Sequence, residues 1–489
     1  MRTTKFLCVS ALACCLCVIP AAAEDDVDRL VAAMLGDTPI IDDLRELTDD
    51  IGGRPTGSDA NRKAVAWAVD TLRQAEVNVT TEDFEMPFQW QEKQVLASIS
   101  GDVSFDPHVI AKPFSTAADA LTASLVDGGS GSAGDFERLG DAAKGAWVLI
   151  ETPELNDDIG LAGLFGLYGN ARQFEGRAKS AGAMGVVQMS PYPKNLVYRQ
   201  FASTNYENDM PLLVMDREHA LRALRLMRSG RSLSLGVTIG IDAGYSYSAT
   251  NVIAEIPGTS RADEIVLFGA HLDSFDLGTG ALDNGVNVVM LINVARQIIK
   301  LGLKPERTIR FALWNGEEQG LVGSWKYTEQ HEDELDNHVV AASFDIGSGR
   351  TTGFFTGGRP PLVPLVDKYL EPVAGLGPFQ QIDVPLVGTD NFDFLIEGVP
   401  NLIAVQSDAN YASNYHAESD TFEKVDQYQV RLNSAISAAV VWGFANDSER
   451  LPSQTHDDNK ALIGSNDLEQ QMTNFYFWCD WAYCKRGRH

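Results

Sequence analysis

The chain has 489 residues, of which 44% are hydrophobic and 22% are charged. This length allows about three domains of roughly 150 residues each, and the composition excludes a disordered or collagen-like chain. The 67 acidic residues outnumber the 39 basic ones and give a net charge of -28, which would repel phosphate backbones and anionic lipid headgroups. We therefore expect neither nucleic acid nor a membrane as a partner.

The segment 1–23 is typical of a signal peptide. A basic start precedes an apolar run (6–20) and then consecutive alanines (21–23). Such a run is too short to span a bilayer of about 30 Å, whereas this order of basic, apolar and small residues is that of a secretory signal. We predict cleavage after Ala23 and a soluble protein that is secreted or periplasmic. A lipid anchor through Cys14 or Cys15 is the alternative.

The region after the signal predicts helices, then strands, then a change of pattern. Residues 25–75 are expected to be helical, with Ser58 as the N-cap of the helix over 59–75, and β-prone segments follow to about residue 109. From about residue 113, short apolar runs alternate with Gly-rich turns and two helical patterns. This change predicts a β-rich insert that folds as a unit of its own.

From about residue 251 the pattern becomes strand, turn and helix in alternation. Strands of nearly continuous apolar character are typical of a parallel sheet that helices cover on both faces. The expected strands are 264–270, 308–313, 338–344 and 401–405, and the expected helices between them include 286–299 and 320–330. We predict an α/β sandwich with a mixed, mainly parallel sheet.

An acidic or imidazole group follows each of these strands. In open α/β sheets ligands bind at the carboxyl ends of the strands, so these side chains are expected to converge. One such motif alone is weak evidence, because an isolated His-x-Asp or Glu-Glu pair is usually a surface feature. Their joint occurrence in one order at one sheet edge is not expected by chance. The candidates are His271, Asp273, Asp283, Glu317, Glu318, Asp345, Tyr415 and His416.

Two histidines and several carboxylates without a thiolate make a ligand set that suits Zn²⁺, and Mn²⁺ or Co²⁺ also accept it. Two ions about 3.5–4 Å apart need a bridging carboxylate, for which Asp283 is the candidate. Glu317 is adjacent to the ligand Glu318 but points differently, so it could take a proton from a metal-bound water and return it to a leaving amine. The set therefore predicts hydrolysis of an amide.

From Arg54 to Asp426 the sequence resembles the co-catalytic zinc exopeptidases. This family includes bacterial leucyl aminopeptidases, glutamate carboxypeptidases and the plasma glutamate carboxypeptidase-like dipeptidases. The resemblance implies one zinc bound by His271 and Asp345, a second bound by Glu318 and His416, a bridge through Asp283, a general base at Glu317, a carboxylate at Asp273 that fixes the tautomer of the His271 ring, and an oxyanion donor at Tyr415.

The insert resembles a protease-associated domain, and its position resembles the plasma glutamate carboxypeptidase-like branch. The short spacing between His271 and Asp283 also resembles that branch. Two departures concern neighbours of the ligands: Asn284 stands where a second acidic residue is often found, and Ser343 replaces a common glutamate. The implied division is a signal peptide (1–23), a first catalytic segment (24–111), a protease-associated insert (112–243), a second catalytic segment with the metal site (244–450) and an unplaced C-terminal tail (451–489).

We predict an exported dizinc metallopeptidase in which a metal-bridged hydroxide cleaves terminal peptide bonds of peptides or dipeptides. No Arg cluster lies near the motifs, which favours an aminopeptidase or dipeptidase over a glutamate-type carboxypeptidase. A non-catalytic binding protein on the same scaffold would have lost metal ligands, and none is lost here. Cys479 and Cys484 in the tail are expected to form a disulfide, with two free thiols as the alternative. A homodimer is left open.

Overall fold

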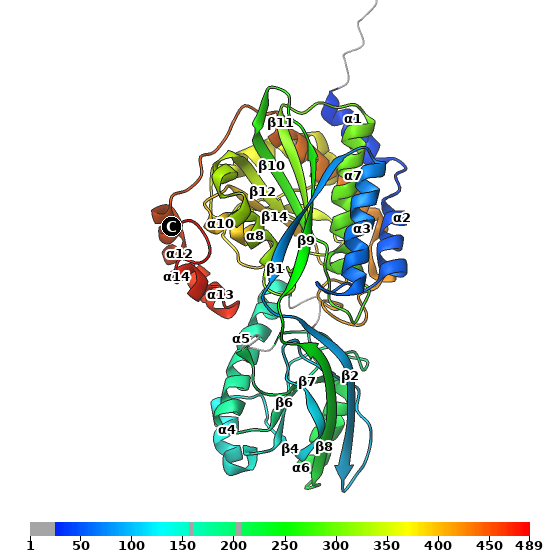
Figure 1. Cartoon of the computed structure of the whole chain (residues 1–489), viewed down its shortest axis with the longest axis vertical. Coiled ribbons are helices and arrows are strands. Elements are labelled where there is room, and N and C mark those ends of the chain that lie inside the picture. Colours follow the sequence, from blue (N-terminus) through cyan, green and yellow to red (C-terminus); the bar gives the residue numbers. More distant parts are fainter. Residues whose placement is uncertain (1–24, 156–159, 202–206) are drawn as a thin grey trace, which may run out of the picture.

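The structure, a computed structural model, describes residues 25–155, 160–201 and 207–489 and contains two seven-stranded sheets. The sheets lie one above the other along the long axis of the molecule, as Figure 1 shows. The predicted signal peptide lies outside the described residues. Within the described ranges, no helix combines the length and the apolar character that crossing a membrane requires.

The upper sheet is mixed. Its four central strands run parallel, while three pairings with the outer strands are antiparallel. The spatial order is β1 (Asn78–Met86), β9 (Tyr247–Ile256), β11 (Arg307–Trp314), β10 (Arg261–His271), β12 (His338–Ser343), β14 (Asn401–Gln406) and β13 (Thr351–Phe355). The mixed sheet is confirmed, but parallel pairs do not predominate. The chain leaves this sheet along β1 and returns along β9, so these neighbours must run in opposite directions.

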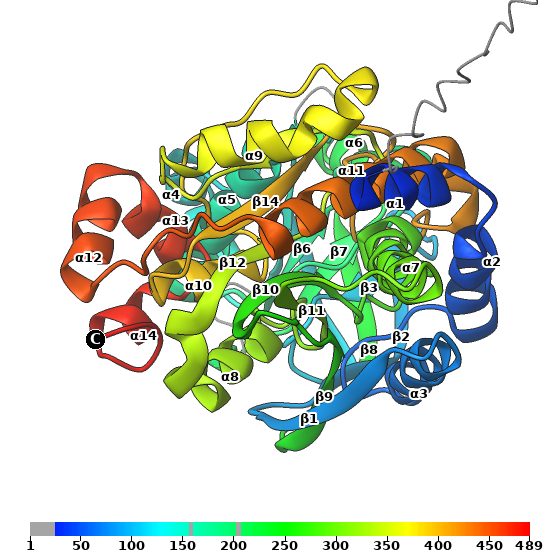
Figure 2. The same cartoon turned by 90° about the horizontal axis from the view of Figure 1, so that it is seen from above.

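Helices cover both faces of the upper sheet, as Figure 2 shows from above. The larger core lies on one face, where apolar side chains of the sheet pack against five helices and the short α2. On the other face Trp314, Tyr327 and Phe394 build a smaller core. The first face carries α1 (Asp26–Leu35), α2 (Ile40–Arg45), α3 (Asp59–Gln74), α7 (Val286–Lys300), α9 (Leu362–Leu370) and α11 (Gln427–Asn446); the second carries α8 (Val322–Gln330) and α10 (Asn391–Ile396).

The expected helix start at Ser58 is confirmed, since its hydroxyl accepts a hydrogen bond from the Asn61 N–H at 3.0 Å. This bond satisfies one of the backbone donors that every helix leaves free in its first turn. The helix places Asn61 under the sheet edge, where its amide donates to Asn315 Oδ1 at 2.5 Å.

The lower sheet begins earlier than predicted. Its order is β2 (Trp90–Gly101), β8 (Leu233–Ala243), β4 (Ala118–Asp127), β5 (Trp147–Ile150), β6 (Gly185–Met189), β7 (Leu212–Met215) and β3 (Val109–Ala111). Because β2 pairs with β8 from Trp90 onward, this unit starts near Trp90 and not at residue 112. Strands β1 and β2 both contain many exposed and half-buried residues, so the sequence pattern did not show that they belong to different sheets. Helices α4 (Ala133–Leu139), α5 (Gly160–Ser180) and α6 (Arg217–Arg228) accompany this sheet.

The C-terminal tail, which the sequence left unplaced, forms α12 (His456–Ser465), α13 (Leu468–Asn474) and α14 (Trp478–Ala482). These helices lie beside α10 in both overall views. Leu468, Met472 and Trp481 are buried against side chains of the upper unit. Cys479 and Cys484 are free and exposed, so the expected disulfide is not formed in the structure. Apolar packing therefore contributes to holding this segment in place.

His338 at the start of β12 predicts a pH dependence of stability. The buried ring donates from Nδ1 to the Glu334 carbonyl at 3.1 Å and accepts at Nε2 from the Tyr327 hydroxyl at 2.9 Å. Burial, aided by the charge of Arg310, lowers the pKa of His338 to about 4. In the unfolded chain the pKa of this ring is about 6.5, so below that pH protons bind the unfolded state more readily than the folded state. The contribution of the neutral ring to the free energy of unfolding is therefore complete above pH 6.5 and is lost as the pH falls toward 4. Its size is about 3 kcal/mol.

We expect wild-type protein to lose more unfolding free energy between pH 7 and pH 4.5 than His338→Gln, whose amide keeps a donor and an acceptor without titrating. Urea unfolding at both pH values measures the difference. An identical loss in the two proteins would contradict this account.

Candidate active site

The carboxyl ends of the four parallel strands meet at one edge of the upper sheet. Each strand there continues into a loop that carries one or more of the candidate residues. The structure brings all five expected ligand residues into two overlapping groups. These groups are His271, Asp283 and Asp345, and Asp283, Glu318 and His416, with the ligand atoms of each group within 4.8 Å of one another.

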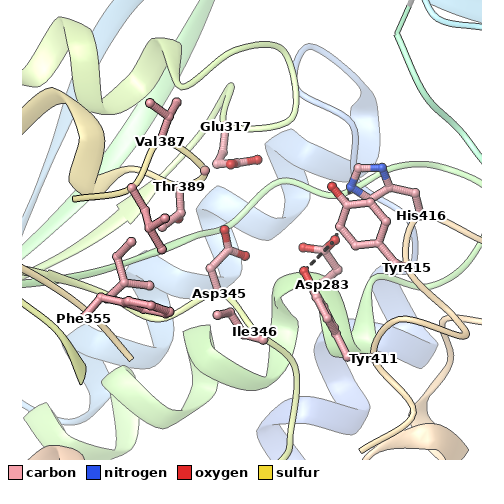
Figure 3. Close-up of a pocket in the computed structure, with 13 residues that line it drawn as sticks. Asp283, Glu317, Asp345, Ile346, Phe355, Val387, Thr389, Tyr411, Tyr415 and His416 are labelled. Carbon is pink, nitrogen blue, oxygen red and sulfur yellow. Dashed lines mark hydrogen bonds and ion pairs between the residues drawn. The ribbon is translucent and has the colours of Figure 1, made fainter. Parts of the chain in front are cut away.

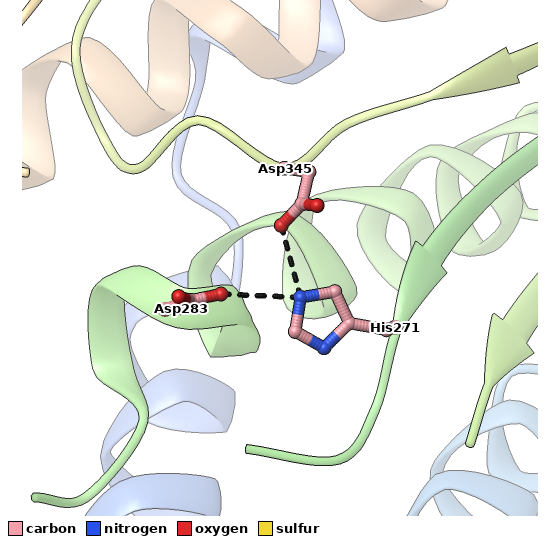
Figure 4. Close-up of side chains that lie close together, drawn as sticks. All are labelled: His271, Asp283 and Asp345. Carbon is pink, nitrogen blue, oxygen red and sulfur yellow. Dashed lines mark hydrogen bonds and ion pairs between the residues drawn. The ribbon is translucent and has the colours of Figure 1, made fainter. Parts of the chain in front are cut away.

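In the first group, two carboxylates approach the same nitrogen of the His271 ring, as Figure 4 shows. His271 Nε2 is 2.9 Å from Asp345 Oδ1 and 3.1 Å from Asp283 Oδ1. The three side chains come from the end of β10, the loop after β12 and the turn before α7. One nitrogen and two carboxylate oxygens thus face a common point, which is a ligand set for a divalent metal ion.

The second group uses the other oxygen of the same aspartate. His416 Nε2 is 3.3 Å from Asp283 Oδ2 and 3.2 Å from Glu318 Oε2. Asp283 therefore presents Oδ1 to one histidine and Oδ2 to the other, which is the arrangement that a carboxylate bridging two ions requires.

A buried aspartate holds the turn that carries Asp283. Asp420 accepts from the backbone N–H groups of Leu282 at 2.7 Å and Asp283 at 3.1 Å. Burial raises the pKa of Asp420 to about 7. The pKa of Asp283 itself is lowered, because its hydrogen bonds to His271 and His416 outweigh the effect of burial.

The site carries an excess of negative charge that a cation would neutralise. Burial lowers the pKa of a histidine, yet Glu318 and Asp283 raise the pKa of His416 to about 9. In the same way Asp345 and Glu317 raise the pKa of His271 well above its usual value. Buried Glu318 Oε1 has no hydrogen-bond partner among the described residues. These residues fit metal ions, because buried carboxylates without a partner are costly unless a cation compensates them.

Backbone carbonyls set the orientation of both imidazole rings. His271 Nδ1 lies 3.0 Å from the Asp273 carbonyl oxygen, whereas the carboxylate oxygen of Asp273 is 3.7 Å away. Asp273 Oδ2 instead accepts from the Thr56 hydroxyl at 2.9 Å. The expected partner of His271 is therefore present, but its closest contact is through the main chain. His416 Nδ1 lies 3.2 Å from the Arg199 carbonyl, in the lower unit. Both contacts favour a proton on Nδ1 and leave Nε2 free for a metal.

Three tyrosines surround the second group. The Tyr415 hydroxyl lies 2.6 Å from the hydroxyl of Tyr168 on α5 of the lower unit. Tyr411 donates to Asp283 Oδ2 at 3.4 Å. Burial raises the pKa of Tyr415 well above its usual value, with further contributions from Tyr168 and Tyr411. Tyr415 therefore stays protonated and can donate a hydrogen bond, as its expected role requires.

Glu317 faces the cavity from the loop after β11 and lies above Asp345 in Figure 3, with His416 to the right. Burial raises the pKa of Glu317 well above its usual value; His271 opposes this rise, and Asp345 and Glu318 add to it. A carboxylate with a raised pKa is a better proton acceptor than an exposed one.

The same cavity has an apolar end. Its polar part includes Asp345 and Asp283, and apolar side chains from two strands and two loops form the apolar end (Figure 3). Five aliphatic or aromatic side chains line this end, and such a lining favours an apolar group in the ligand. They are Ile346, Phe355, Leu386, Val387 and Ile403.

Sequence reasoning missed the cation that supports the site. The buried Arg54 side chain donates to the carbonyls of Leu272 at 2.5 Å, Thr279 at 2.9 Å and Gly280 at 2.9 Å. It thus ties the loop after β10 to the turn before Asp283. Burial lowers the pKa of Arg54 to about 10, so it remains charged. Arg54 stands alone in the sequence without a motif around it, and no spacing signal could have found it.

The lower unit also contributes residues to the site. Arg199 joins the two units through an ion pair with Asp276 at 2.8 Å, and it also pairs with Glu92 of its own unit at 2.8 Å. Its backbone N–H donates to the His416 carbonyl at 2.9 Å. Tyr168 and Arg199 are far apart in the sequence from the Tyr415 and His416 that they contact, so their roles depend on the tertiary fold.

Comparison with known proteins gives the family. Residues 251–441 match the model of peptidase family M28. The chain is 25% identical over 422 residues to carboxypeptidase Q of Xenopus laevis, covering 84% of this chain and 86% of that protein. It is 26% identical over 475 residues to the probable lipoprotein aminopeptidase LpqL of Mycobacterium tuberculosis, covering 88% of each.

A solved structure extends the likeness to three dimensions. The peptidase M28 precursor from Shewanella amazonensis superposes with a TM-score of 0.79 at 27% identity, covering 88% of this chain and 98% of that one. The suspected family and branch are therefore confirmed: residues 251–441 match peptidase family M28, of the co-catalytic zinc exopeptidase type, and the relatives include carboxypeptidase Q and aminopeptidases.

Proposed function

We propose that the protein is an exported dizinc exopeptidase that removes N-terminal residues from peptides or dipeptides. The observation that carries this proposal is the position of Asp283, whose two carboxylate oxygens face His271 and His416 separately. A single-ion site would not need this division of one carboxylate. Export is supported by the sequence pattern of residues 1–23.

The finer architecture belongs to the same proposal. We assign the upper unit to a three-layer α/β/α sandwich of the zinc exopeptidase type, supported by helices on both faces of its sheet. We assign the lower unit to a protease-associated domain, supported by its position between β1 and β9 in the chain. In this arrangement the insert contacts Tyr415, which lines the cavity, through the hydroxyl of Tyr168.

His271 and Asp345 would hold one ion, Glu318 and His416 the other, with Asp283 shared between them. Zn²⁺ suits two imidazoles and three carboxylates best, and Mn²⁺ or Co²⁺ are the alternatives. When bound, the ions would supply Lewis-acid polarisation of the scissile carbonyl and lower the pKa of water.

The remaining chemistry falls to two side chains of this chain. Glu317 accepts the proton of the attacking water and delivers it to the nitrogen of the leaving amine, so that the C–N bond breaks without forming an amide anion. Tyr415 donates a hydrogen bond to the oxygen on which negative charge develops, and its high pKa keeps the proton available. Asp273 and Arg54 keep the loop of His271 in place.

The cavity lining favours an amine terminus. A free carboxylate needs a cationic partner, and among the described lining residues of this cavity none is Lys or Arg. Its carboxylates would instead attract an ammonium group, and its apolar end would take the side chain of the terminal residue. The glutamate-type carboxypeptidase is therefore the second candidate, which the names of the carboxypeptidase Q relatives keep open.

A panel of leucine peptides tests the direction of cleavage. We expect Leu-Ala and Leu-Ala-amide to be hydrolysed, acetyl-Leu-Ala to resist, and Leu or Phe at the N-terminus to exceed Asp or Lys in kcat/KM. Hydrolysis of acetyl-Leu-Ala with loss of the amide as a substrate would replace the proposal with the carboxypeptidase alternative.

The adjacent glutamates should separate by role. Glu317→Gln cannot accept a proton, so kcat should fall by roughly 10²–10⁴-fold while metal content and KM stay near wild type. Glu318→Gln replaces an anionic ligand with a neutral amide, so metal should be lost and activity should partly return with excess Zn²⁺. Turnover and elemental analysis of both variants measure this. Near-normal turnover in Glu317→Gln, or equal metal loss in both variants, would contradict the assignment.

Metal should leave the site more readily in mild acid. His271 and His416 bind metal only through an unprotonated Nε2, so protons compete with the ions as the pH falls. We expect dialysis against a chelator at about pH 5 to remove zinc and activity, while the same treatment at about pH 8 removes far less. Zinc added back at pH 8 should restore activity. Retention that does not depend on pH would show that the two imidazoles are not ligands.

A further inference from the structure

A buried ion pair attaches the C-terminal segment to the upper unit. Arg486 donates from Nε to Asp393 Oδ1 at 2.6 Å and from Nη2 to Asp393 Oδ2 at 2.8 Å. Both side chains are at most 2% exposed. The aromatic rings of Phe477 and Trp325 lie 4.4 and 4.8 Å from the guanidinium carbon. The guanidinium of Arg486 is therefore held in one orientation by two hydrogen bonds and by packing on both rings.

The same guanidinium reaches the loop that carries the two catalytic-site glutamates. Its Nη1 and Nη2 groups donate to the carbonyls of Gly320 at 3.3 Å and Leu321 at 3.2 Å. The N–H groups of these two residues donate in turn to the Glu317 carbonyl, at 2.8 and 2.9 Å. One turn of backbone thus connects Arg486 to Glu317.

That turn has a backbone conformation that needs support. Leu321 has a φ of 59° and Gly320 a φ of 112°. A left-handed conformation is disfavoured for a leucine, because its Cβ approaches the neighbouring carbonyl oxygen. Such a conformation persists where the surroundings determine it, and the donors of Arg486 on the two carbonyls do so here.

The C-terminal segment also supports the apolar end of the cavity. Gln471 on α13 accepts at Oε1 from the N–H of Val387 at 3.0 Å. Val387 lines the cavity, and its side chain belongs to the same buried cluster as Met472 and Ile463 of the segment. The segment therefore touches the active site at two separate loops, one bearing Glu317 and one forming the apolar wall.

We propose that residues 456–489 position the active site, with Arg486 holding the Glu317 loop and Gln471 holding the apolar wall. This segment lies beyond the match to the family model, which ends at residue 441. The inference rests on the proposed function. It assigns the two residues as positioning residues, since both act through backbone and neither reaches the substrate.

The test uses the full-length, zinc-saturated enzyme and a leucine peptide substrate. Arg486→Met should lower kcat at least about tenfold and change KM by less than about twofold, since the displaced group is the proton acceptor. Arg486→Lys can pair with Asp393 but cannot serve both carbonyls, so it should keep more thermal stability than Arg486→Met and still lose turnover. Gln471→Leu should show the opposite split, with a raised KM for apolar substrates and nearly unchanged kcat.

Arg488→Met is the matched control. Arg488 lies in the same segment and pairs with the exposed Asp336 at 2.6 Å, without contact to the Glu317 loop. Its substitution should leave kcat and KM unchanged.

The outcomes separate this inference from the proposed function. A wild-type enzyme that cleaves no peptide would overturn both. If the wild type is active and folded Arg486→Met has the same kcat, the inference alone is overturned. It is also overturned if Arg488→Met loses as much turnover as Arg486→Met. If Arg486→Met does not fold, wild-type turnover in Arg486→Lys would overturn it.

Discussion

The structure depends on confining negative charge at one edge of a sheet. Asp283, Asp345, Glu317 and Glu318 share a largely buried space with two imidazoles, although carboxylates repel one another there and lose their hydration. Such a cluster is stable only where cations and fixed dipoles compensate it. The architecture around the site meets this need by directing backbone donors, a buried arginine and the strand ends to the same place.

The compensation is distributed over elements far apart in the chain. Arg54, from the loop before α3, binds three carbonyls of the two loops around His271 and Asp283. Asp420 holds the turn of Asp283 from the other side through two backbone N–H groups. Neither Arg54 nor Asp420 lines the cavity of Figure 3, yet each limits the positions that the Asp283 carboxylate can take. The precision of the site therefore comes from its supporting residues as well as from its ligands.

Sequence reasoning was strongest where a pattern repeats along the chain. The alternation of apolar strands and helices predicted β10, β11, β12 and β14, and placing polar residues at the strand ends identified the residues that converge. It failed where a role depends on tertiary neighbours. The carbonyl of Arg199 acts at a site that is distant in the sequence, and the antiparallel pairing of β1 with β9 follows from where the insert leaves and re-enters the sheet. The main-chain contact of Asp273 could not be foreseen either, because a motif specifies a residue type and not which of its atoms faces a partner.

The bridge between the units has a consequence for biogenesis. Tyr198 and Ala417 pair across the units as an isolated antiparallel bridge, and next to it the Arg199 carbonyl orients the ring of His416. The orientation of the His416 ring is therefore set by a segment of the insert between β6 and β7. A nascent chain with a folded upper sheet and an unfolded insert would lack a correctly held His416. The orientation of His416 therefore depends on the folding of both units.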